Sequence, residues 1–229
     1  MEKFVTTQKT KLGRIPTRGH FDRATVYAIL DAAPICHLAL AFDNEPTVLP
    51  TIHTRVEDSI YLHGARSNRL LNRIAEGAPL CLTATLLDGL VLAKSGLHHS
   101  MNYRSVVVYG RGISVDKDDE KMRALEALVD GIIPGRWADS RQPTPEELRA
   151  TLVIKVPIVE ASAKMRTGPP SDEAKDESLP IWAGVLPLSS NFAAPDAADY
   201  GPSVPVPGYV LNLQSLGFER RSERIPPCL

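Results

Sequence analysis

The sequence has few cysteines and no long apolar run, and each lack excludes a class of protein. Cys36, Cys81 and Cys228 are odd in number, far apart and without C-x-x-C spacing. Neither a disulfide framework nor a zinc site is therefore indicated. No window approaches about 18 uninterrupted apolar residues, and the polar first residues lack the apolar core of a signal peptide. We expect a soluble, unexported protein of the reducing cytoplasm with no membrane partner.

An excess of basic charge is also missing. Lys and Arg number 26 against 27 Asp and Glu, which gives a formal net charge of −1. No basic stripe exists to neutralise a phosphate backbone, so we expect no nucleic-acid partner. A Walker lysine and a G-x-G-x-x-G motif are absent as well, which argues against the nucleotide-binding folds that use them.

What the chain does contain is a series of short apolar and β-branched runs separated by turn residues. A helix is expected to begin at Asp22, because its carboxylate can cap the first turn. Thr144 with Glu147 forms a capping-box pattern that predicts a second, short helix. Further helices are predicted over 66–76 and 116–129, and strands over 35–42, 47–56, 60–63, 80–87, 90–93, 103–109, 111–115 and 152–159.

These strands follow one another too closely for a helix between every pair. The fold class expected is therefore mainly β with peripheral helices, built on an antiparallel, closed or partly closed sheet. Composition divides the chain into a polar arm over 1–20, one domain over 21–190 and a tail over 191–229 that is rich in loop residues.

A phosphate site is the most specific functional signal in the sequence. A strand ends at His63-Gly64 and leads directly to Arg66, Ser67, Asn68 and Arg69 at the start of a predicted helix. Free backbone amides, a hydroxyl and two guanidinium groups at one point suit a phosphate. The alternative is an ordinary strand-to-helix turn with solvated arginines, and the local sequence leaves both open.

Two further segments carry polar or aromatic side chains without a defined chemistry. Adjacent His98 and His99 point to opposite faces of an extended chain, so we predict no metal site there. Trp182 lies in a loop with few other apolar residues and is expected to cover either its own core or a ligand. Arg166 is interpreted as a surface residue near Asp172 or Asp176.

Taken together, five segments in order resemble the pyridoxamine 5′-phosphate oxidase-like superfamily, in particular its flavin-nucleotide-binding branch with the nitroimidazole-resistance (Nim) proteins. The matching segments are 24–30 with 37–39, 61–65, 102–106 with Gly110, 120–125, and 164–170 with 182–185. The resemblance implies a six-stranded antiparallel split β-barrel that works as a homodimer, with FMN in a cleft formed by both subunits.

Residue by residue, the resemblance implies a two-subunit flavin site. The flavin ring would lie against Pro50, Thr51, Ile52 and His53, the ribityl chain along His63, Gly64 and Ala65, and the phosphate on Ser67, Asn68 and Arg69. The neighbouring strand would contribute Ser100, Met101, Asn102 and Ser105, and Trp182 of the other subunit would cap the cleft. Relatives that bind haem or a deazaflavin leave the identity of the cofactor open.

Two functions follow from this resemblance. The first is an FMN-dependent oxidoreductase acting on a small molecule, in which the flavin exchanges hydride and the protein orients the substrate. The second is a flavin-binding carrier or sensor without turnover. We do not expect oxidation of pyridoxamine phosphate itself, because the tail over 217–225 does not reproduce the substrate-binding segment of the true oxidase.

Overall fold

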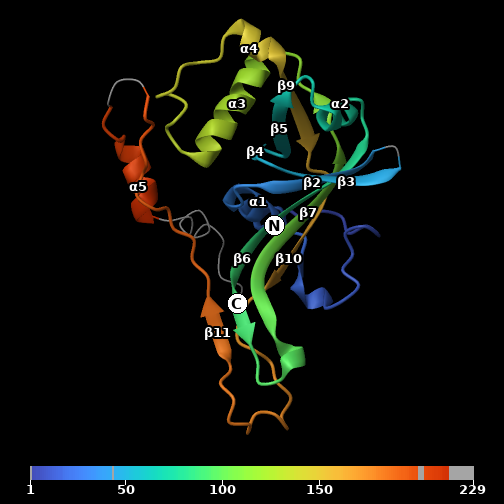
Figure 1. Ribbon diagram of the computed structural model, residues 1–229. Helices are drawn as coiled ribbons and strands as arrows, with labels where there is room; N and C mark the ends of the chain where they lie inside the picture. The colour runs from blue at the N-terminus through green and yellow to red at the C-terminus, as the bar shows by residue number, and fades with distance from the viewer. Residues whose placement is uncertain (1, 43, 201–203, 217–229) are drawn as a thin grey trace.

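Two antiparallel β-sheets that share one hydrophobic core form the body of the protein (Figure 1). The computed structural model describes residues 2–42, 44–200 and 204–216. Buried Leu38 and Leu82 of one sheet belong to the same core cluster as Leu62 and Ile154 of the other. The expected fold class, a mainly β split barrel with peripheral helices, is confirmed. The last part of the tail predicted over 191–229, from residue 217 onward and including Cys228, lies outside the described residues.

The long sheet extends from the middle of the molecule to its lower tip in Figure 1. Its strand order is β1-β10-β7-β6-β2-β3, and β11 pairs with β6 beside this path. The strands are β1 (Gly19–His20), β2 (Cys36–Phe42), β3 (Glu45–Thr51), β6 (Pro79–Leu92), β7 (Ser100–Arg111), β10 (Glu160–Arg166) and β11 (Gly184–Pro187).

The short sheet lies at the other end, in the order β4-β5-β9-β8. Its strands are β4 (Thr54–Val56), β5 (Ser59–Ala65), β8 (Ile113–Ser114) and β9 (Thr151–Pro157). The chain crosses between the sheets at Gly112, where an added Cβ would lie 2.3 Å from Ile74 Cγ2. Only glycine allows this close approach at the corner.

The helices are peripheral, and side-chain caps open α1, α2 and α4. They are α1 (Arg23–Ala32), α2 (Arg69–Ala75), α3 (Asp118–Ile132), α4 (Pro145–Ala150), α5 (Gly208–Leu216) and the 3₁₀ turns η1 (Pro16–Arg18) and η2 (Gly96–His98). Asp22 caps α1 and the Thr144 capping box opens α4, both as predicted. The start expected at Asp116 is wrong, because its carboxylate accepts a hydrogen bond from Ser114 Oγ at 3.0 Å and α3 begins later. Among the described residues, no helix has the length and apolarity needed to cross a membrane.

Two of the expected strand assignments are wrong for tertiary reasons, and a further strand was missed. The run over 47–56 is split, since β3 and β4 belong to different sheets. The turn expected at Asp88-Gly89 is instead a bulge in one continuous β6, where Asp88 pairs with Arg104 of β7. An added Cβ at Gly89 would lie 2.9 Å from the Leu186 carbonyl oxygen, so glycine lets β11 pair there. Strand β10 was not predicted at all.

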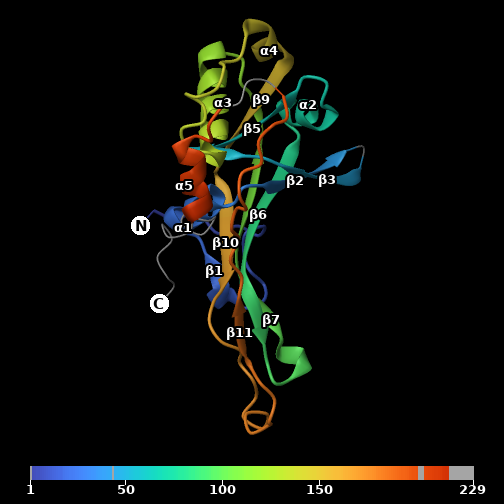
Figure 2. The same ribbon diagram turned by 60° about the vertical axis from the view of Figure 1, so that its left-hand side comes forward.

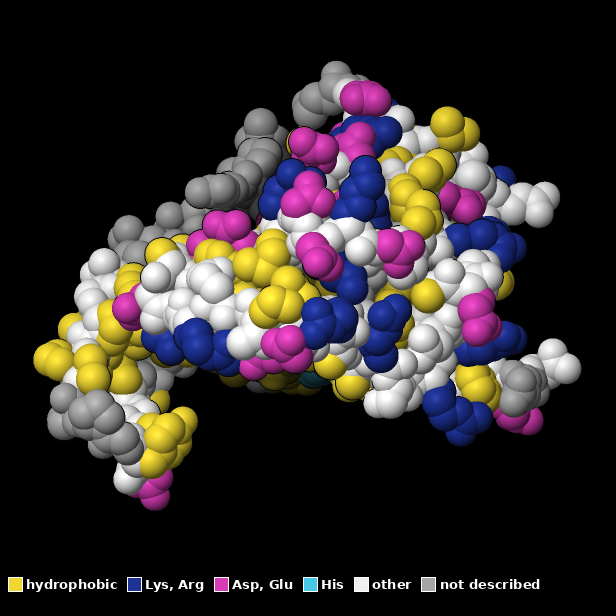
Figure 3. Space-filling view, turned by 90° about the horizontal axis from the view of Figure 1, so that it is seen from above, with side chains coloured by type: hydrophobic (Ala, Val, Ile, Leu, Met, Phe, Trp, Pro, Cys, Tyr) yellow, Lys and Arg dark blue, Asp and Glu magenta, His cyan; other side chains and the backbone are white. Residues whose placement is uncertain are grey.

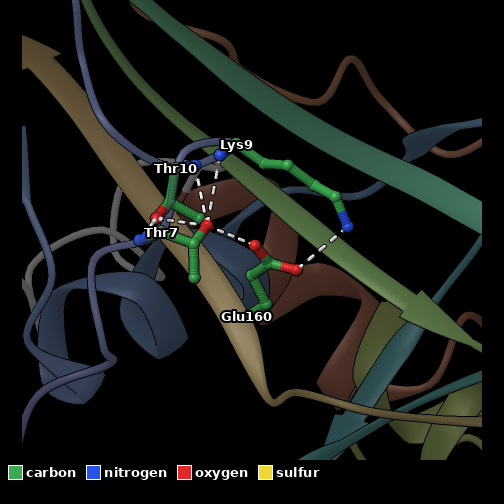
Figure 4. Close-up of polar contacts among 4 residues, drawn as sticks. All are labelled: Thr7, Lys9, Thr10 and Glu160. Atoms are coloured by element: carbon green, nitrogen blue, oxygen red, sulfur yellow. Dashed lines mark hydrogen bonds and ion pairs between the residues drawn. The ribbon is translucent and has the colours of Figure 1, made fainter.

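The N-terminal arm is fastened to the body by hydrogen bonds as well as by packing. Phe4 is buried in the core and stacks edge-on against Tyr27. Figure 4 shows that Thr7 and Lys9 both reach Glu160 at the start of β10, with Lys9 Nζ 3.3 Å from Glu160 Oε2. Thr10 Oγ1 accepts the Thr7 amide at 2.8 Å and closes the turn.

The C-terminal segment runs from β11 back along the molecule to α5, beside α3 (Figures 1 and 2). The Tyr209 hydroxyl accepts from Arg136 at 3.1 Å and donates to Asp139 at 2.7 Å. The end of the molecule that carries α3 and α4 has acidic and basic side chains interspersed (Figure 3). Several of them form exposed pairs, such as Arg149 with Glu146.

Candidate functional site

The junction of β5 and α2 has the geometry of a tight strand-to-helix turn. An added Cβ at Gly64 would lie 2.6 Å from Leu71 Cδ1, so a larger residue here would require the Leu71 side chain of α2 to move. The Asn68 side chain accepts from the amides of Leu70 at 3.0 Å and Leu71 at 3.1 Å. The expectation of free amides at this turn is therefore wrong for these two groups, because Asn68 itself caps the helix.

The cations at this junction are available for a ligand. Arg66, Ser67 and Arg69 are exposed, and within the described chain neither arginine pairs with a carboxylate. The Arg69 guanidinium lies 4.9 Å from the centre of the Phe42 ring, which holds it beside the β2–β3 hairpin. Arg73 differs, since it forms an ion pair with Glu76 at 2.9 Å. Two exposed arginines without a carboxylate partner among the described residues thus stand close in sequence to the exposed hydroxyl of Ser67, and these groups suit a phosphate.

The segment over 50–53 lies where the chain leaves the long sheet. Pro50 and Thr51 end β3 opposite His37 and Cys36, and the segment continues through Ile52. The fourth residue, His53, is only 6% exposed and its Nε2 lies 3.0 Å from the Leu30 carbonyl oxygen.

The protonation state of His53 follows from this contact. A carbonyl only accepts, so Nε2 carries the hydrogen, and Nδ1 is a buried acceptor without a partner among the described residues. Burial lowers the pKa of His53 against the opposing effect of the Leu30 hydrogen bond, which favours the neutral imidazole. His53 therefore presents a lone pair and no charge.

His63 is a second imidazole whose buried Nδ1 lacks a hydrogen-bond partner among the described residues. It lies on β5 opposite Val153 and is partly buried. Burial lowers its pKa. Gly64 and Ala65 continue the strand towards the exposed Arg66. A neutral imidazole of this kind can accept a proton or bind a metal.

The residues that the resemblance places on the strand beside the flavin lie far from the β5–α2 junction in one chain. Ser100, Met101 and Asn102 begin β7 at the lower tip, whereas α2 lies at the opposite end (Figures 1 and 2). Ser105 Oγ donates to the Lys164 carbonyl at 3.0 Å, so this hydroxyl is committed within the sheet. One chain therefore does not bring these residues to the phosphate cluster. A site that uses both would need two subunits.

The loop that follows β10 is held by buried charges which the sequence did not reveal. Arg166 is 9% exposed and donates to Asn102 and to the carbonyls of Gly168 and Pro169, so its interpretation as a surface residue is wrong. Asp172 accepts from the amides of Lys94 and Ser95, and these bonds lower its pKa. The clustering of Pro and Gly after Arg166 was the only signal that this loop needs anchoring.

Trp182, which was expected to cover a ligand or its own core, is exposed, and His98 and His99 lie at the β6–β7 tip. Trp182 is 67% exposed, and its ring lies over Gly184, where an added Cβ would be 2.8 Å away. His98 Nδ1 lies 3.7 Å from Asp172 Oδ1, and His99 Nδ1 lies 3.0 Å from the Ser95 carbonyl oxygen. In the described chain, no three His, Cys, Asp or Glu side chains gather as a metal site.

Comparison with known proteins finds a matching family model and two solved structures that are more than 30% identical to this chain. The family model described as pyridoxamine 5′-phosphate oxidase matches residues 22–165. Flavocytochrome Anf3 from Azotobacter vinelandii is 38% identical, with a TM-score of 0.85 over 90% of this chain and 97% of that one. The FAD and haem binding protein from Mycobacterium smegmatis is 36% identical, with a TM-score of 0.82 over 86% and 97%.

A proposed 5-nitroimidazole antibiotic resistance protein from Bacteroides thetaiotaomicron shares the fold at 22% identity, with a TM-score of 0.53 over 64% of this chain and 85% of that one. No curated protein matches the chain. The family match covers most of the described strands of both sheets, including the β5–α2 junction. The chain therefore belongs to the pyridoxamine 5′-phosphate oxidase family.

Proposed function

We propose that the protein is a flavin-dependent oxidoreductase whose flavin phosphate binds at Arg66, Ser67 and Arg69. The observation that carries this proposal is the pair of exposed guanidinium groups without a carboxylate partner within the described chain. Surface arginines commonly pair with neighbouring carboxylates, as Arg73 does here. A phosphate dianion would supply the negative partner that both arginines lack within the described chain.

The two relatives above 30% identity support a flavin, since one is described as a flavocytochrome and the other binds FAD. We propose FMN because the phosphate cluster is compact, with FAD as the alternative. Unfolding the purified protein and separating the released cofactor by chromatography distinguishes the two. A bound flavin supplies hydride transfer, while the chain orients the ring and the substrate.

We further propose a homodimer with the flavin between subunits, in the cytoplasm. Exposed apolar side chains cover the β6–β7 tip and β11, including Leu97 at 92% and Leu186 at 57% exposure. A second copy would bury them and could bring Met101 or Trp182 to the phosphate cluster of its partner. Mass measured in solution tests this, and a strict monomer would contradict it.

Replacing Arg69 by Ala tests the phosphate assignment. Loss of one charge-assisted contact should weaken flavin binding by about 1.5 to 3 kcal/mol, roughly 10- to 150-fold. Arg73→Ala is the matched control, because Arg73 lies on the same helix and contacts the same ring but pairs with Glu76. Equal affinities of wild type and Arg69→Ala would refute the assignment.

Turnover separates the oxidoreductase from a flavin carrier or sensor. The yellow colour of the purified protein should bleach when a reduced nicotinamide is added and return with an electron acceptor. A bound flavin that none of the tested donors reduces would favour the carrier or sensor instead.

A flavin-and-haem protein is the second candidate, favoured by the same two relatives. His63 would hold the haem iron, because burial lowers the pKa of its imidazole and its Nδ1 has no hydrogen-bond partner within the described chain. Haem would add one-electron chemistry. His63→Ala should then abolish the Soret absorption, whereas Arg69→Ala should weaken flavin binding and keep the Soret absorption.

A further inference from the structure

The turn between β5 and α2 is held by the side chain of Asn72, which lies one helical turn further along α2. Asn72 Nδ2 donates to the Arg66 carbonyl at 2.7 Å and to the Asn68 carbonyl at 2.9 Å. Carbonyl oxygens only accept hydrogen bonds, so the nitrogen of the amide must face both of them. Both carbonyls of the turn are thereby committed to Asn72, and its N–H groups offset their partial negative charge.

The backbone of the same turn is also fixed from the other side, by the junction of α4 and β9. The Arg66 amide donates to the Ala150 carbonyl at 3.0 Å, next to the strand pairing of Ala65 with Thr151. Within the turn, the Asn68 amide donates to the Ala65 carbonyl at 2.9 Å. The turn is therefore held on two sides although it lies at the surface.

A buried lysine of α3 supports the α4–β9 junction from behind. Lys121 is 6% exposed, and its Nζ donates to the Thr151 carbonyl at 3.3 Å and to the Leu148 carbonyl at 3.4 Å. These two carbonyls flank Ala150, whose own carbonyl accepts the Arg66 amide. Lysine is seldom buried without a partner, and here the last carbonyls of α4 serve as its partners. Lys121 thus holds the segment against which the turn rests.

These contacts bear on the affinity of the proposed phosphate site. A surface turn that is free to move loses conformational entropy when a ligand fixes it, and this loss weakens binding. We infer that Asn72 and Lys121 are positioning residues that hold Arg66 and Ser67 in place for the flavin phosphate. The inference rests on the proposed function, and it requires no contact between either residue and the ligand.

FMN and riboflavin form a matched pair of probes, since they share the ring and the ribityl chain and only FMN carries the phosphate. The ratio of their dissociation constants, measured by flavin fluorescence on the full-length protein freed of its flavin, isolates the effect of the phosphate. Asn72→Leu keeps the approximate size of the side chain and removes both donors. It should lower the preference for FMN about 3- to 30-fold, the scale of one or two net hydrogen bonds, and leave riboflavin binding unchanged.

Lys121 is tested by the same ratio. Lys121→Met should lower the preference for FMN in the same direction, because it removes the donor to the α4 carbonyls. Lys121→Arg keeps the charge and the donors and should restore most of the preference. Asn72 is only half-buried, so its variant keeps the inference open to refutation should Lys121→Met fail to fold.

Ile74→Val separates positioning of the turn from general loosening of the helix. Ile74 is fully buried on α2 and makes none of the bonds that hold the turn. Its truncation should lower the unfolding midpoint yet leave the preference for FMN intact. A wild-type preference in Asn72→Leu, or an equal loss in Ile74→Val, would overturn the inference.

Failure of the proposed function gives a different result. Wild-type protein that binds riboflavin as tightly as FMN, or an Arg69→Ala variant with unchanged preference, would refute the phosphate site itself. A preference for FMN that Arg69→Ala removes and that Asn72→Leu and Lys121→Met retain would refute only the positioning role.

Discussion

Arg166 of β10 donates a hydrogen bond to the side-chain oxygen of Asn102 on the neighbouring β7, and both side chains are 9% exposed. The same guanidinium donates to the carbonyls of Gly168 at 3.1 Å and Pro169 at 2.9 Å. Burial lowers the pKa of Arg166, and the nearby charge of Arg18 adds to this. A buried cation thus fixes the start of the loop that leads to Trp182.

Replacing Arg166 by Met should be strongly destabilising, because it leaves the buried Asn102 side-chain oxygen without its donor and removes the contacts to the Gly168 and Pro169 carbonyls. We expect a loss of about 2 to 4 kcal/mol in the free energy of unfolding, measured with urea. Arg149→Ala is the control, since its pair with Glu146 is exposed and should contribute less than about 1 kcal/mol. A loss for Arg166→Met no larger than that of the control would contradict the anchoring role.

Gly112→Ala should disturb the corner between the sheets. The new Cβ would lie 2.3 Å from Ile74 Cγ2 and 2.6 Å from Ile154 Cγ2, which forces both side chains to move. We expect a loss of about 1 to 3 kcal/mol in unfolding free energy. Gly96→Ala meets nothing within 4 Å and should be nearly neutral or slightly stabilising, so equal midpoints for the two variants would argue against a tight corner.

Glu147 should titrate far below an ordinary glutamate. Arg141 first, and the Thr144 amide second, lower its pKa from 4.5 to about 2. Because the folded-state pKa is depressed, its contribution to stability is present above pH 4.5 and is lost as the pH falls towards 2.

An NMR titration of the glutamate side chains checks this. Arg141→Gln should move the Glu147 midpoint up towards 4.5, while Glu146, which pairs with Arg149 instead, should keep its own lowered pKa. A Glu147 midpoint that does not respond to Arg141→Gln would show that the ion pair does not form in solution.

Cys36 should be inert in the folded protein. It has no exposed surface, and burial raises the pKa of its thiol to about 12, so almost no thiolate exists near neutral pH. In a Cys228→Ser background, a thiol reagent should label Cys81 before Cys36, which should react only on unfolding. Fast labelling of Cys36 in the native state, located by peptide mass, would contradict its burial.

Trp182 should report on flavin binding if it caps the cofactor of the partner subunit. Added FMN would then quench its fluorescence, because the indole and the flavin ring would be in contact. The chain has only one other tryptophan, so Trp137→Phe isolates Trp182 and Trp182→Phe isolates Trp137. Quenching that persists in Trp182→Phe and is absent in Trp137→Phe would refute the capping role.

Local signals predicted much of the fold because they act within a few residues. Asp22 caps α1 through the Thr25 amide, and Thr144 with Glu147 forms a reciprocal pair of bonds at α4. The strands missed or misread depend on distant partners. Strand β10, with Ala, Ser, Lys and Met, has weak β-propensity and is held by pairing with β7 on one side and β1 on the other.

The same contrast between local signals and distant contacts applies to the candidate site. Gly64, Ser67 and Arg69 could be predicted as a phosphate site from the sequence because such a site can be built from adjacent residues, and this assignment stays a prediction. The burial of Arg166 and the lone pair of His53 could not be read from it, since Asn102 and Leu30 are far away in the chain.

The sequence by itself determined the mainly β character, the caps of α1 and α4 and the presence of arginines after Gly64, since these follow from residues that are near neighbours in the chain. Only the tertiary structure decided which sheet each strand joins, that Asp88 forms a bulge with Arg104, and that Nδ1 of His53 is left unpaired among the described residues. The physical reason is that burial and long-range pairing decide the fate of polar groups, and both depend on residues that the chain brings together only when it folds.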